Sequence, residues 1–267
     1  MLDLKLDDKR ALVTGSSSGI GEAIARTLAN QGAAVVVHGR NAERAERIAD
    51  EINRAGPGSA VVALGDLSRQ DEADRVARSA LEELGGIDIL IDNAGRGMPH
   101  TSWFEASVEA WQQLFEANFF SAVRMIRALV PGMKERRWGR VIQIASVAAT
   151  KPSPSSAAYA ASKAAMVNMS VSLAKELAGT GVTVNTVSPG PVVTPLFEQV
   201  VREGGADREQ LEASATYVGR FGRPEEIADL VAFLASPRAG FIDGANIAID
   251  GGRRDIDLAP ARPPAHA

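Results

Sequence analysis

The stretch Thr14-Gly15-Ser16-Ser17-Ser18-Gly19-Ile20-Gly21 decides the fold, because it joins a short apolar run to the first long amphipathic stretch. Such a turn needs backbone without side-chain bulk, and the glycines at positions 19 and 21 allow a helix to approach closely. The helix N-terminus offers unpaired N–H groups and a positive dipole end to a phosphate. A tight strand–helix turn without a ligand is the alternative. The position after the first strand favours a dinucleotide-binding turn.

Apolar runs rich in valine and isoleucine alternate with longer amphipathic stretches along the chain. Apolar strands separated by helices are typical of a parallel sheet buried on both sides. Right-handed crossovers then predict a single α/β domain, a doubly wound parallel sheet with helices on both faces. The expected strands are Ala11–Thr14, Ala34–His38, Ala60–Leu64, Ile87–Asp92, Arg140–Ala145, Val182–Ser188 and Ala245–Ile249. The expected helices are Gly21–Gln31, Ala42–Ala55, Asp71–Leu84, Val108–Arg136 and Ala157–Leu177.

One domain is expected over residues 1–252, because no repeat or dividing linker interrupts this range. Residues 195–216 break the alternation and are expected to form a helical substrate-loop insertion between a strand and a helix. The tail of residues 253–267 is rich in alanine and proline, and we expect it to be disordered.

Composition excludes several classes of function. The 267 residues carry a net charge of −4, which argues against a broadly basic surface for nucleic acid. There are no cysteines, and the three histidines lack metal-ligand spacing, so no protein-made metal site is expected. The start of the chain lacks a signal-peptide pattern, and no apolar run is long enough to span a bilayer. The default expectation is a cytoplasmic protein that does not bind membranes.

Tyr159 and Lys163 are the first candidates for chemistry. Four positions apart on one helix, they lie on the same face, one turn apart. An ammonium close to a phenol favours the phenolate, so the sequence predicts that Lys163 lowers the pKa of Tyr159 towards working pH. Tyr159 would then donate or accept the proton in an alcohol–carbonyl exchange. Most Tyr-x-x-x-Lys matches are structural, but here Ser146 precedes the tyrosine by thirteen residues.

Cofactor discrimination is expected at the end of the second strand, where NAD-preferring sites usually carry an acidic residue. The chain has His38-Gly39-Arg40-Asn41 there, without a carboxylate. The Arg40 guanidinium would hold a 2′-phosphate, which predicts NADPH over NADH, although a solvated arginine is the alternative. Asp66 is expected at the adenine amino group and Asn93-Ala94-Gly95 beside the adenosine ribose. Ordinary turn chemistry would also explain both.

These motifs together resemble the classical short-chain dehydrogenase/reductase family, with a match from about Asp7 to Gly252. Within it, the chain is most similar to NADPH-dependent members like 3-oxoacyl-acyl-carrier-protein reductase. The resemblance implies a Rossmann fold and a homotetramer. It is carried by Thr14–Gly21, Asp66, Asn93-Ala94-Gly95, Asn118, Ser146, Tyr159, Lys163, Ser188-Pro189-Gly190, Gly222-Arg223-Pro224-Glu225-Glu226 and Asp250-Gly251-Gly252.

The resemblance also implies four catalytic roles. Ser146 would hydrogen-bond the substrate carbonyl oxygen, and Tyr159 would protonate it as hydride arrives. Lys163 would hold the nicotinamide ribose, and Asn118 would hold a water in a proton relay to Lys163. The expected cofactor contacts are Gly15, Ser17, Ser18, Gly19, Ile20, Gly21, Arg40, Asn41, Asp66, Leu67, Asn93, Ala94, Gly95, Tyr159, Lys163, Pro189, Gly190, Val192 and Thr194. The expected substrate contacts are Ser146, Val147, Tyr159, Leu196 and Phe197.

The sequence therefore predicts an NADP(H)-dependent oxidoreductase acting on a small carbonyl or alcohol compound, foremost a 3-oxoacyl thioester. A mostly apolar substrate wall suits an acyl group better than a bare sugar. A dehydrogenase of a sugar, polyol or steroid-like alcohol is the alternative, and a non-catalytic NADP-binding regulator is the alternative from another class. The four intact catalytic residues argue against the regulator.

Four basic residues, Lys134, Arg136, Arg137 and Arg140, cluster at the end of a long expected helix. Two interpretations stay open from the sequence. The charges would complement the negative end of the helix dipole, or they would form a docking patch for an acidic acyl carrier protein.

Overall fold

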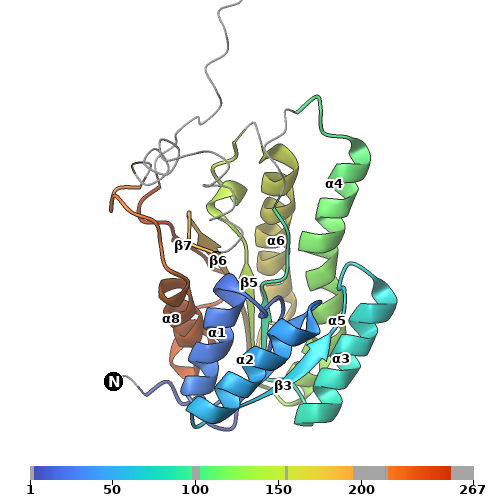
Figure 1. Ribbon diagram of the computed structural model, residues 1–267, viewed down its shortest axis with the longest axis vertical. Helices are drawn as coiled ribbons and strands as arrows, with labels where there is room; N and C mark the ends of the chain where they lie inside the picture. Colours follow the sequence, from blue (N-terminus) through green and yellow to red (C-terminus); the bar gives the residue numbers. More distant parts are fainter. Residues whose placement is uncertain (1–2, 98–102, 154–155, 195–213, 215, 254–267) are drawn as a thin grey trace, which may run out of the picture.

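The structure is a computed structural model that describes residues 3–97, 103–153, 156–194, 214 and 216–253. Seven parallel strands form a sheet with the order β3-β2-β1-β4-β5-β6-β7 (Figure 1). The strands are β1 (Arg10–Val13), β2 (Ala34–Gly39), β3 (Ser59–Leu64), β4 (Ile89–Asp92), β5 (Gly139–Ile144), β6 (Val182–Pro189) and β7 (Asn246–Ile249). The strand order reverses between β1 and β4, so the predicted doubly wound α/β fold is confirmed.

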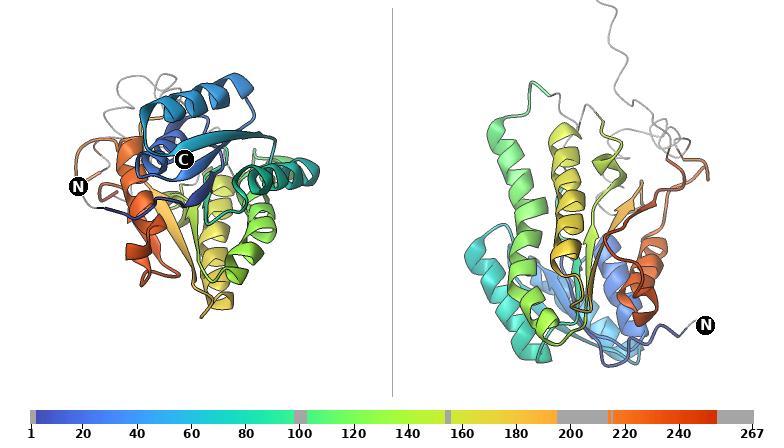
Figure 2. Two further views of the ribbon diagram at one scale, coloured as in Figure 1. Left: turned by 90° about the horizontal axis from the view of Figure 1, so that it is seen from below. Right: turned by 180° about the vertical axis from the view of Figure 1, so that it is seen from behind.

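Helices cover both faces of the sheet (Figures 1 and 2). One face carries α1 (Gly19–Asn30), α2 (Ala42–Ala55) and α8 (Pro224–Ala235). The other carries α3 (Gln70–Leu84), α5 (Ser121–Glu135) and α6 (Ala157–Glu176), with α4 (Val108–Phe115) leading into α5. Among the described residues, no helix combines the length and the apolar character needed to cross a bilayer.

Alternate residues of the strands feed two separate hydrophobic cores. Val35 of β2 packs with Leu28 of α1 on one face, whereas its neighbour Val36 packs with Met125 of α5 on the other. All four side chains are fully buried. Burial on both faces explains why the strand sequences are almost continuously apolar.

The expected helix Val108–Arg136 is interrupted. A π-helical turn, Glu116–Phe120, separates α4 from α5. Such a turn inserts a residue into an otherwise regular helix and is frequent at functional sites. Hydrophobic periodicity cannot register one inserted residue, so the prediction of a single continuous helix was wrong at this point.

The four basic residues do not form one exposed patch. Arg140 is buried in β5, where its guanidinium donates to the carbonyls of Gly139 (2.8 Å) and Ser236 (3.3 Å) and lies 4.7 Å from the Trp138 ring centroid. Arg136 pairs with Asp88 at 3.4 Å. Helices of a parallel sheet run against the strands, so the end of α5 lies at the amino edge of the sheet, away from ligands at the carboxyl edge.

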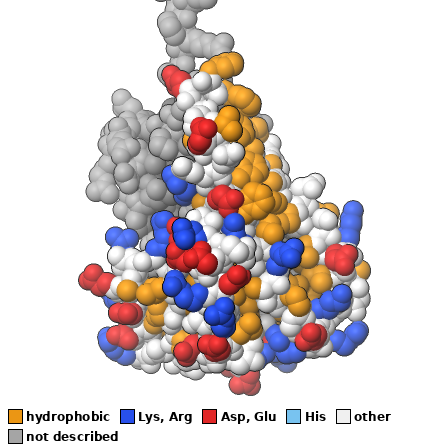
Figure 3. All heavy atoms as spheres, turned by 90° about the vertical axis from the view of Figure 1, so that its right-hand side faces the viewer, with side chains coloured by type: hydrophobic (Ala, Val, Ile, Leu, Met, Phe, Trp, Pro, Cys, Tyr) orange, Lys and Arg blue, Asp and Glu red, His pale blue; other side chains and the backbone are white. Residues whose placement is uncertain are grey.

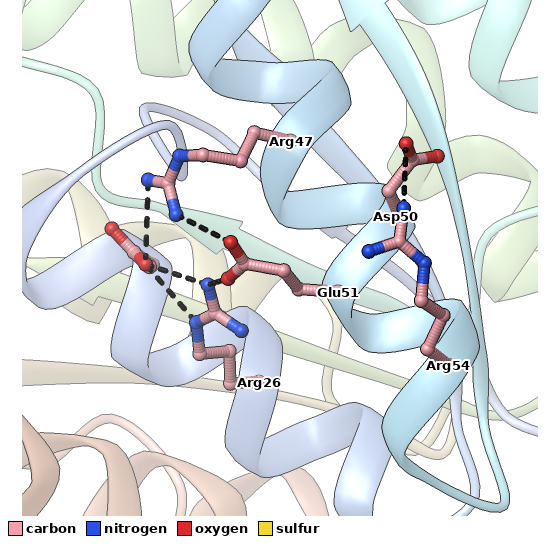
Figure 4. A network of polar contacts seen from close by, with 6 residues as sticks. Arg26, Arg47, Asp50, Glu51 and Arg54 are labelled. Atoms are coloured by element: carbon pink, nitrogen blue, oxygen red, sulfur yellow. Dashed lines mark hydrogen bonds and ion pairs between the residues drawn. The ribbon is translucent and has the colours of Figure 1, made fainter.

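Ion pairs tie α1 to α2 on the surface (Figure 4). Arg26 of α1 contacts Glu22 of its own helix at 2.9 Å and also Glu51 of α2, which in turn pairs with Arg47 at 2.9 Å. Because Arg26 contacts carboxylates on two different helices, the network links α1 to α2 at the surface.

Asp88 provides a test of electrostatic stabilisation at the amino edge. Its carboxylate accepts two 2.7 Å hydrogen bonds from Arg10, which hold the pKa of Asp88 below 3.8 although burial raises it. Asp88→Asn should lower the unfolding free energy at pH 7 by about 1–3 kcal/mol. The wild-type advantage should vanish as the pH falls below 3.8 through the lowered pKa of the folded state.

Urea unfolding of both proteins from pH 7 to pH 3 measures this difference. Asp50→Asn is the matched control, because the pair of Asp50 with Arg54 (3.3 Å) is mostly exposed and should contribute little. An equal loss in the two variants would contradict the assignment.

Candidate active site

Two adjoining cavities open at the carboxyl edge of the sheet, with volumes of about 370 and 280 Å³. Both are bordered by Gly15, Ser18, Ala94 and Gly95, so they form one groove with two ends. The larger cavity is called here the catalytic end and the smaller one the adenosine end. A wider hollow of about 890 Å³ lies against α4 and borders none of the predicted catalytic residues.

The glycine-rich turn is held by β1, α1 and β4 together. Gly15 has φ +66° and so occupies the left-handed region that favours glycine. A Cβ at Gly21 would lie 2.4 Å from the Gly15 carbonyl oxygen and 2.4 Å from Asn93 Nδ2, so no side chain fits there. Asn93 Nδ2 donates to the carbonyls of Thr14 (2.9 Å) and Gly15 (3.1 Å). The Asn93 Nδ2 group therefore supports the turn, and Asn93 also borders the catalytic end, where its cofactor contact is predicted.

His38 also holds the glycine-rich turn in place, through hydrogen bonds of both ring nitrogens. Its Nδ1 accepts from the Gly15 amide at 2.9 Å, and its Nε2 lies 3.1 Å from the Gly65 carbonyl oxygen, so the ring is the neutral tautomer with hydrogen on Nε2. Burial lowers the pKa of His38 to about 4, although the contact with Gly65 raises it. Sequence reasoning missed this role and used His38 only as evidence that no carboxylate ends the strand.

The start of α1 fits the phosphates of a dinucleotide. Ser18 is the N-cap residue, and its side chain makes no capping hydrogen bond, so the N–H groups of the first turn have no hydroxyl partner there. Ser18, Gly19 and Ile20 border the catalytic end of the groove. Ser17 borders the adenosine end. Unpaired donors at a helix N-terminus beside an open groove are the donor set that an anionic pyrophosphate needs.

Most residues predicted at the adenosine end are brought together there. Arg40, Asp66 and Leu67 border this end, and the Arg40 side chain is 78% exposed. Asp66 Oδ1 accepts from Ser68 Oγ at 2.7 Å, while its Oδ2 faces the Arg40 guanidinium at 3.9 Å. Asn41 borders neither end. Its Oδ1 accepts from the Arg44 amide at 2.9 Å and so caps α2.

Ser146, Tyr159 and Lys163 meet at the catalytic end, as the sequence predicts. Ser146 ends the β5 segment and caps a short 3₁₀ turn, Val147–Ala149, by accepting from the Ala148 amide at 3.2 Å. Its hydroxyl is hydrogen-bonded to the Tyr159 side chain. Tyr159 and Lys163 both come from α6. Val147 does not border this end, and the expected substrate residues Leu196 and Phe197 lie outside the described residues.

The expected effect of Lys163 on Tyr159 is not found. Burial raises the pKa of Tyr159, and the hydrogen bond with Ser146 opposes this shift. Lys163 Nζ lies 6.0 Å from the Tyr159 ring centroid and donates to the Ile144 carbonyl at 2.8 Å. Burial also lowers the pKa of Lys163 to about 8. Desolvation therefore outweighs the charge effect that the sequence spacing suggests.

Asn118 connects the loop after β4 to α6. Its Oδ1 accepts from the Arg96 amide at 2.8 Å, and its Nδ2 donates to the Arg96 carbonyl (3.1 Å) and to Ser162 Oγ (3.0 Å). Ser162 Oγ in turn donates to the Tyr159 carbonyl at 2.7 Å. A Cβ at Gly95 would lie 2.9 Å from Asn118 Oδ1 and 3.6 Å from Lys163 Nζ, so only glycine leaves room between the two side chains. Ser162 lies within the Tyr-x-x-x-Lys motif, yet its role depends on Asn118 and was not predicted.

The remaining predicted contacts also border the catalytic end. They are Pro189, the last residue of β6, and Gly190, Val192 and Thr194, which follow it. A Cβ at Gly190 would lie 2.7 Å from Asp250 Cα, which explains the glycine. Within the described part of the chain, no group of three or more His, Asp or Glu side chains could hold a metal ion.

His38 gives a pH-dependent test of the turn. A ring whose pKa is lowered from 6.5 to about 4 by folding stabilises the protein fully above pH 6.5 and loses this contribution as the pH falls to about 4. The difference corresponds to about 3 kcal/mol at 1.36 kcal/mol per pH unit. In His38→Gln, urea unfolding should show a much weaker decrease in stability between pH 6.5 and pH 4.5. An identical decrease in both proteins would show that His38 is not buried as a neutral ring.

Comparison with known proteins agrees with this geometry. The family model described as enoyl-(acyl carrier protein) reductase matches residues 15–254. The 3-oxoacyl-(acyl-carrier-protein) reductase FabG of Vibrio cholerae is 38% identical over 251 residues, which cover 93% of this chain and 98% of that protein.

Two solved structures extend the likeness to the fold. L-sorbose reductase from Gluconobacter frateurii, complexed with NADPH and L-sorbose, has a TM-score of 0.89 and 35% identity, covering 94% of this chain and 98% of that one. A 7α-hydroxysteroid dehydrogenase complexed with NADH and 7-oxo glycochenodeoxycholic acid has a TM-score of 0.90 and 32% identity, covering 96% and 98%. Since both sequence and fold match over nearly the whole chain, this protein belongs to the classical short-chain dehydrogenase/reductase family of oxidoreductases.

Proposed function

We propose that the protein is an NADPH-dependent reductase that converts a carbonyl to a secondary alcohol, with a 3-oxoacyl thioester as its substrate. The observation that carries the proposal is the meeting of Ser146, Tyr159 and Lys163 in the same groove as the glycine-rich turn. A proton donor, a hydroxyl beside it and a phosphate-binding helix end are the three parts that hydride transfer to a carbonyl requires from the protein.

When bound, NADPH supplies the hydride. The protein supplies the proton, and its path begins at the Tyr159 hydroxyl, which donates to the substrate oxygen while Ser146 Oγ hydrogen-bonds the same oxygen. Burial raises the pKa of Tyr159, so the phenol stays protonated at neutral pH and ready to act as the acid. The Lys163 ammonium, 6.0 Å from the centre of the Tyr159 ring, would hold the nicotinamide ribose. Asn118 hydrogen-bonds both Arg96, in the loop after β4, and Ser162 of α6, so it holds this loop in place next to Tyr159 and Lys163.

The preference for NADPH is argued from Arg40. The guanidinium lies at the adenosine end, is 78% exposed, and has only a 3.9 Å contact with Asp66 to give up. No carboxylate ends β2 to receive ribose hydroxyls, because Gly39 and Arg40 stand there. The sorbose reductase structure contains NADPH and the steroid dehydrogenase complex contains NADH, so the family alone does not decide the matter.

The thioester substrate is supported by the 38% identity to FabG and by apolar residues at the catalytic end, among them Ile144, Pro191 and Val192. The substrate is proposed as a free thioester or one carried on a carrier protein, without a role for the basic residues near Arg136. A ketose or a ring ketone is the alternative that the names of the structural relatives favour.

A homotetramer is part of the proposal. Figure 3 shows a band of hydrophobic side chains on the side of the molecule where α4 stands. Four large apolar residues of this region are exposed, namely Trp103 (58%), Phe104 (97%), Val108 (67%) and Phe120 (42%). Burial of such a band between subunits would remove apolar surface from water. Light scattering at several concentrations measures the assembly.

The first test is the initial rate of NADPH oxidation with acetoacetyl-coenzyme A. In Tyr159→Phe, kcat should fall by about 100- to 10,000-fold, because the acid is lost. The Kd for NADPH, from fluorescence titration, should change by less than about threefold, since the hydroxyl is proposed to contact the substrate. Loss of NADPH binding together with turnover would mean a structural role for Tyr159.

A parallel panel separates the substrate classes. It contains a 2-enoyl thioester, L-sorbose and a 7-oxo bile acid beside acetoacetyl-coenzyme A. Tyrosine-dependent turnover of the ketose or the steroid alone would discard the thioester and keep the chemistry.

The cofactor assignment predicts a second result. Arg40→Ala should lower the ratio of kcat/KM for NADPH to kcat/KM for NADH by about 10- to 100-fold, the value of one charge-assisted contact. Arg44→Ala is the control, because Arg44 lies in the first turn of α2 and borders neither end of the groove. An unchanged ratio in Arg40→Ala would remove the 2′-phosphate from the proposal.

A further inference from the structure

A row of buried polar side chains crosses the sheet beneath the catalytic end. Asp92 of β4, Gln143 of β5 and Thr186 of β6 are register partners, and each is at most 3% exposed. Register partners on neighbouring strands point to the same face. The residues two positions earlier belong to the core on the α5 and α6 side; they are Leu90, Val141 and Val184. The polar row therefore continues a hydrophobic layer beneath α5 and α6.

Each member of this row carries a buried oxygen that has no hydrogen-bond partner among the residues that the structure describes. They are Asp92 Oδ1, Gln143 Oε1 and Thr186 Oγ1. The row contains one hydrogen bond, in which Gln143 Nε2 donates to Asp92 Oδ2 at 2.5 Å. Unpaired buried polar groups cost stability, and an apolar residue at each position would continue the layer without this cost. A local departure of this kind is expected where function requires it.

Lys163 is the cation that this row faces. Its side chain is 5% exposed, and its Nζ donates to the carbonyl of Ile144, the residue next to Gln143 in β5. Gln143 is the register partner of Asp92 and Ile144 follows Gln143, so the ammonium lies near the end of β4 that carries the Asp92 carboxyl. The Lys163 ammonium donates to one carbonyl oxygen at 2.8 Å and lies 3.6 Å from the Met166 sulfur. A buried ammonium with such neighbours gains from an anion nearby.

The other groups around Lys163 do not provide that anion. On its own helix the titratable neighbour is Tyr159, which is uncharged when protonated. Ser146 and Thr186, from the β5 and β6 side, are uncharged. The remaining charged residues on elements near Lys163 are placed elsewhere. Glu109 of α4 borders the outer hollow, and Glu116 pairs with Arg124 at 2.7 Å. Arg96 borders the groove, and Arg140 lies at the other end of β5.

We propose that Asp92 is a positioning residue of the reaction, a buried carboxyl whose ionisation above neutral pH supplies the countercharge that keeps Lys163 an ammonium. This inference rests on the proposed function for its bearing on catalysis. Gln143 orients the carboxyl through Oδ2, and Oδ1 is left to interact with the cation. Asp92 touches neither substrate nor cofactor and acts through Lys163.

The titration behaviour of the two groups is consistent with this role. Burial raises the pKa of Asp92 to about 8, while Gln143 and Lys163 lower it. Burial lowers the pKa of Lys163 to about 8, while Asp92 raises it. Both groups therefore titrate around pH 8. The Asp92 carboxyl is mostly protonated at pH 7 and becomes an anion as the pH rises through the range in which Lys163 would otherwise lose its proton. Without the carboxyl, Lys163 should lose its proton at a lower pH.

The test measures Lys163 directly in the protein without added cofactor. The chain has six lysines, so NMR of lysine labelled with ¹³C at Cε resolves a few signals, and Lys163→Met identifies the one required. In Asp92→Asn, which keeps an acceptor for Gln143, the midpoint of the Lys163 titration should fall by about one to two pH units. An unchanged midpoint overturns the proposal, whatever the protein catalyses.

Kinetic measurements then test whether the protonation of Lys163 matters for the reaction. The alkaline limb of kcat/KM should move to lower pH in Asp92→Asn by the same amount as the NMR midpoint. A limb that stays in place while the midpoint moves would overturn the catalytic part of the inference. Absence of tyrosine-dependent turnover in the wild type would instead be a failure of the proposed function.

Two controls separate charge from structure. Asp88→Asn makes the same substitution at a buried acid of the amino edge, and it should lower stability without moving the Lys163 midpoint. Thr186→Val removes an unpaired hydroxyl of the same row without removing charge, and it should also leave the midpoint in place. A shift of the same size in either control would overturn the role assigned to the Asp92 charge.

A reciprocal measurement covers the case in which Asp92→Asn does not fold. Coupling between two sites is equal in both directions. The Asp92 carboxyl, followed by aspartate labelled with ¹³C at Cγ, should therefore titrate at a higher pH in Lys163→Met than in the wild type. An equal titration in both proteins would overturn the proposal.

Discussion

The close approach of α1 to the end of β1 is the constraint on which the site depends. Gly21 lies so near the Gly15 carbonyl and the Asn93 amide that any side chain would displace one of them. Asn93 belongs to β4's end, so the same contact that brings the helix N-terminus to the groove also fixes where the two halves of the sheet meet. His38 adds β2 and the end of β3 to this junction through Gly15 and Gly65. The phosphate-binding end and the strand-order reversal are therefore one structural unit.

Desolvation governs the chemistry at this edge. Burial raises the pKa of Tyr159 and of Asp92 and lowers the pKa of Lys163 and of His38, so all four shifts favour the neutral form. For a phenol that must donate a proton, this is useful, because the acid stays loaded. For an ammonium it is a cost, which must be offset by an anion or by acceptors close by. Whether each buried group is charged therefore depends on the partners that lie next to it.

Local patterns allowed much of this to be predicted. The seven expected strands differ from the observed ones by at most two residues at either end, since Val- and Ile-rich runs between helices carry strong information. Tyr159, Lys163 and Ser146 lie close in sequence, so their meeting follows from one helix and the strand before it. The roles of His38 and Asp92 depend on partners in other strands. Nothing in the local sequence around either residue reveals those partners, and burial, which reverses the expected pKa of Tyr159, is likewise a property of the whole fold.

The π-helical turn shows how the fold reconciles two demands on one helix. Residues of α5 such as Met125 and Leu129 must face the core beneath them, while Asn118 must face Ser162 of α6. In a continuous α-helix both directions are tied to a period of 3.6 residues. One inserted residue changes the phase between α4 and α5, so Asn118 can serve the loop of Arg96 and the helix of Tyr159 while the apolar stripe of α5 remains buried. The asparagine that is unfavourable within a regular helix is thereby placed at the point where the helix is not regular.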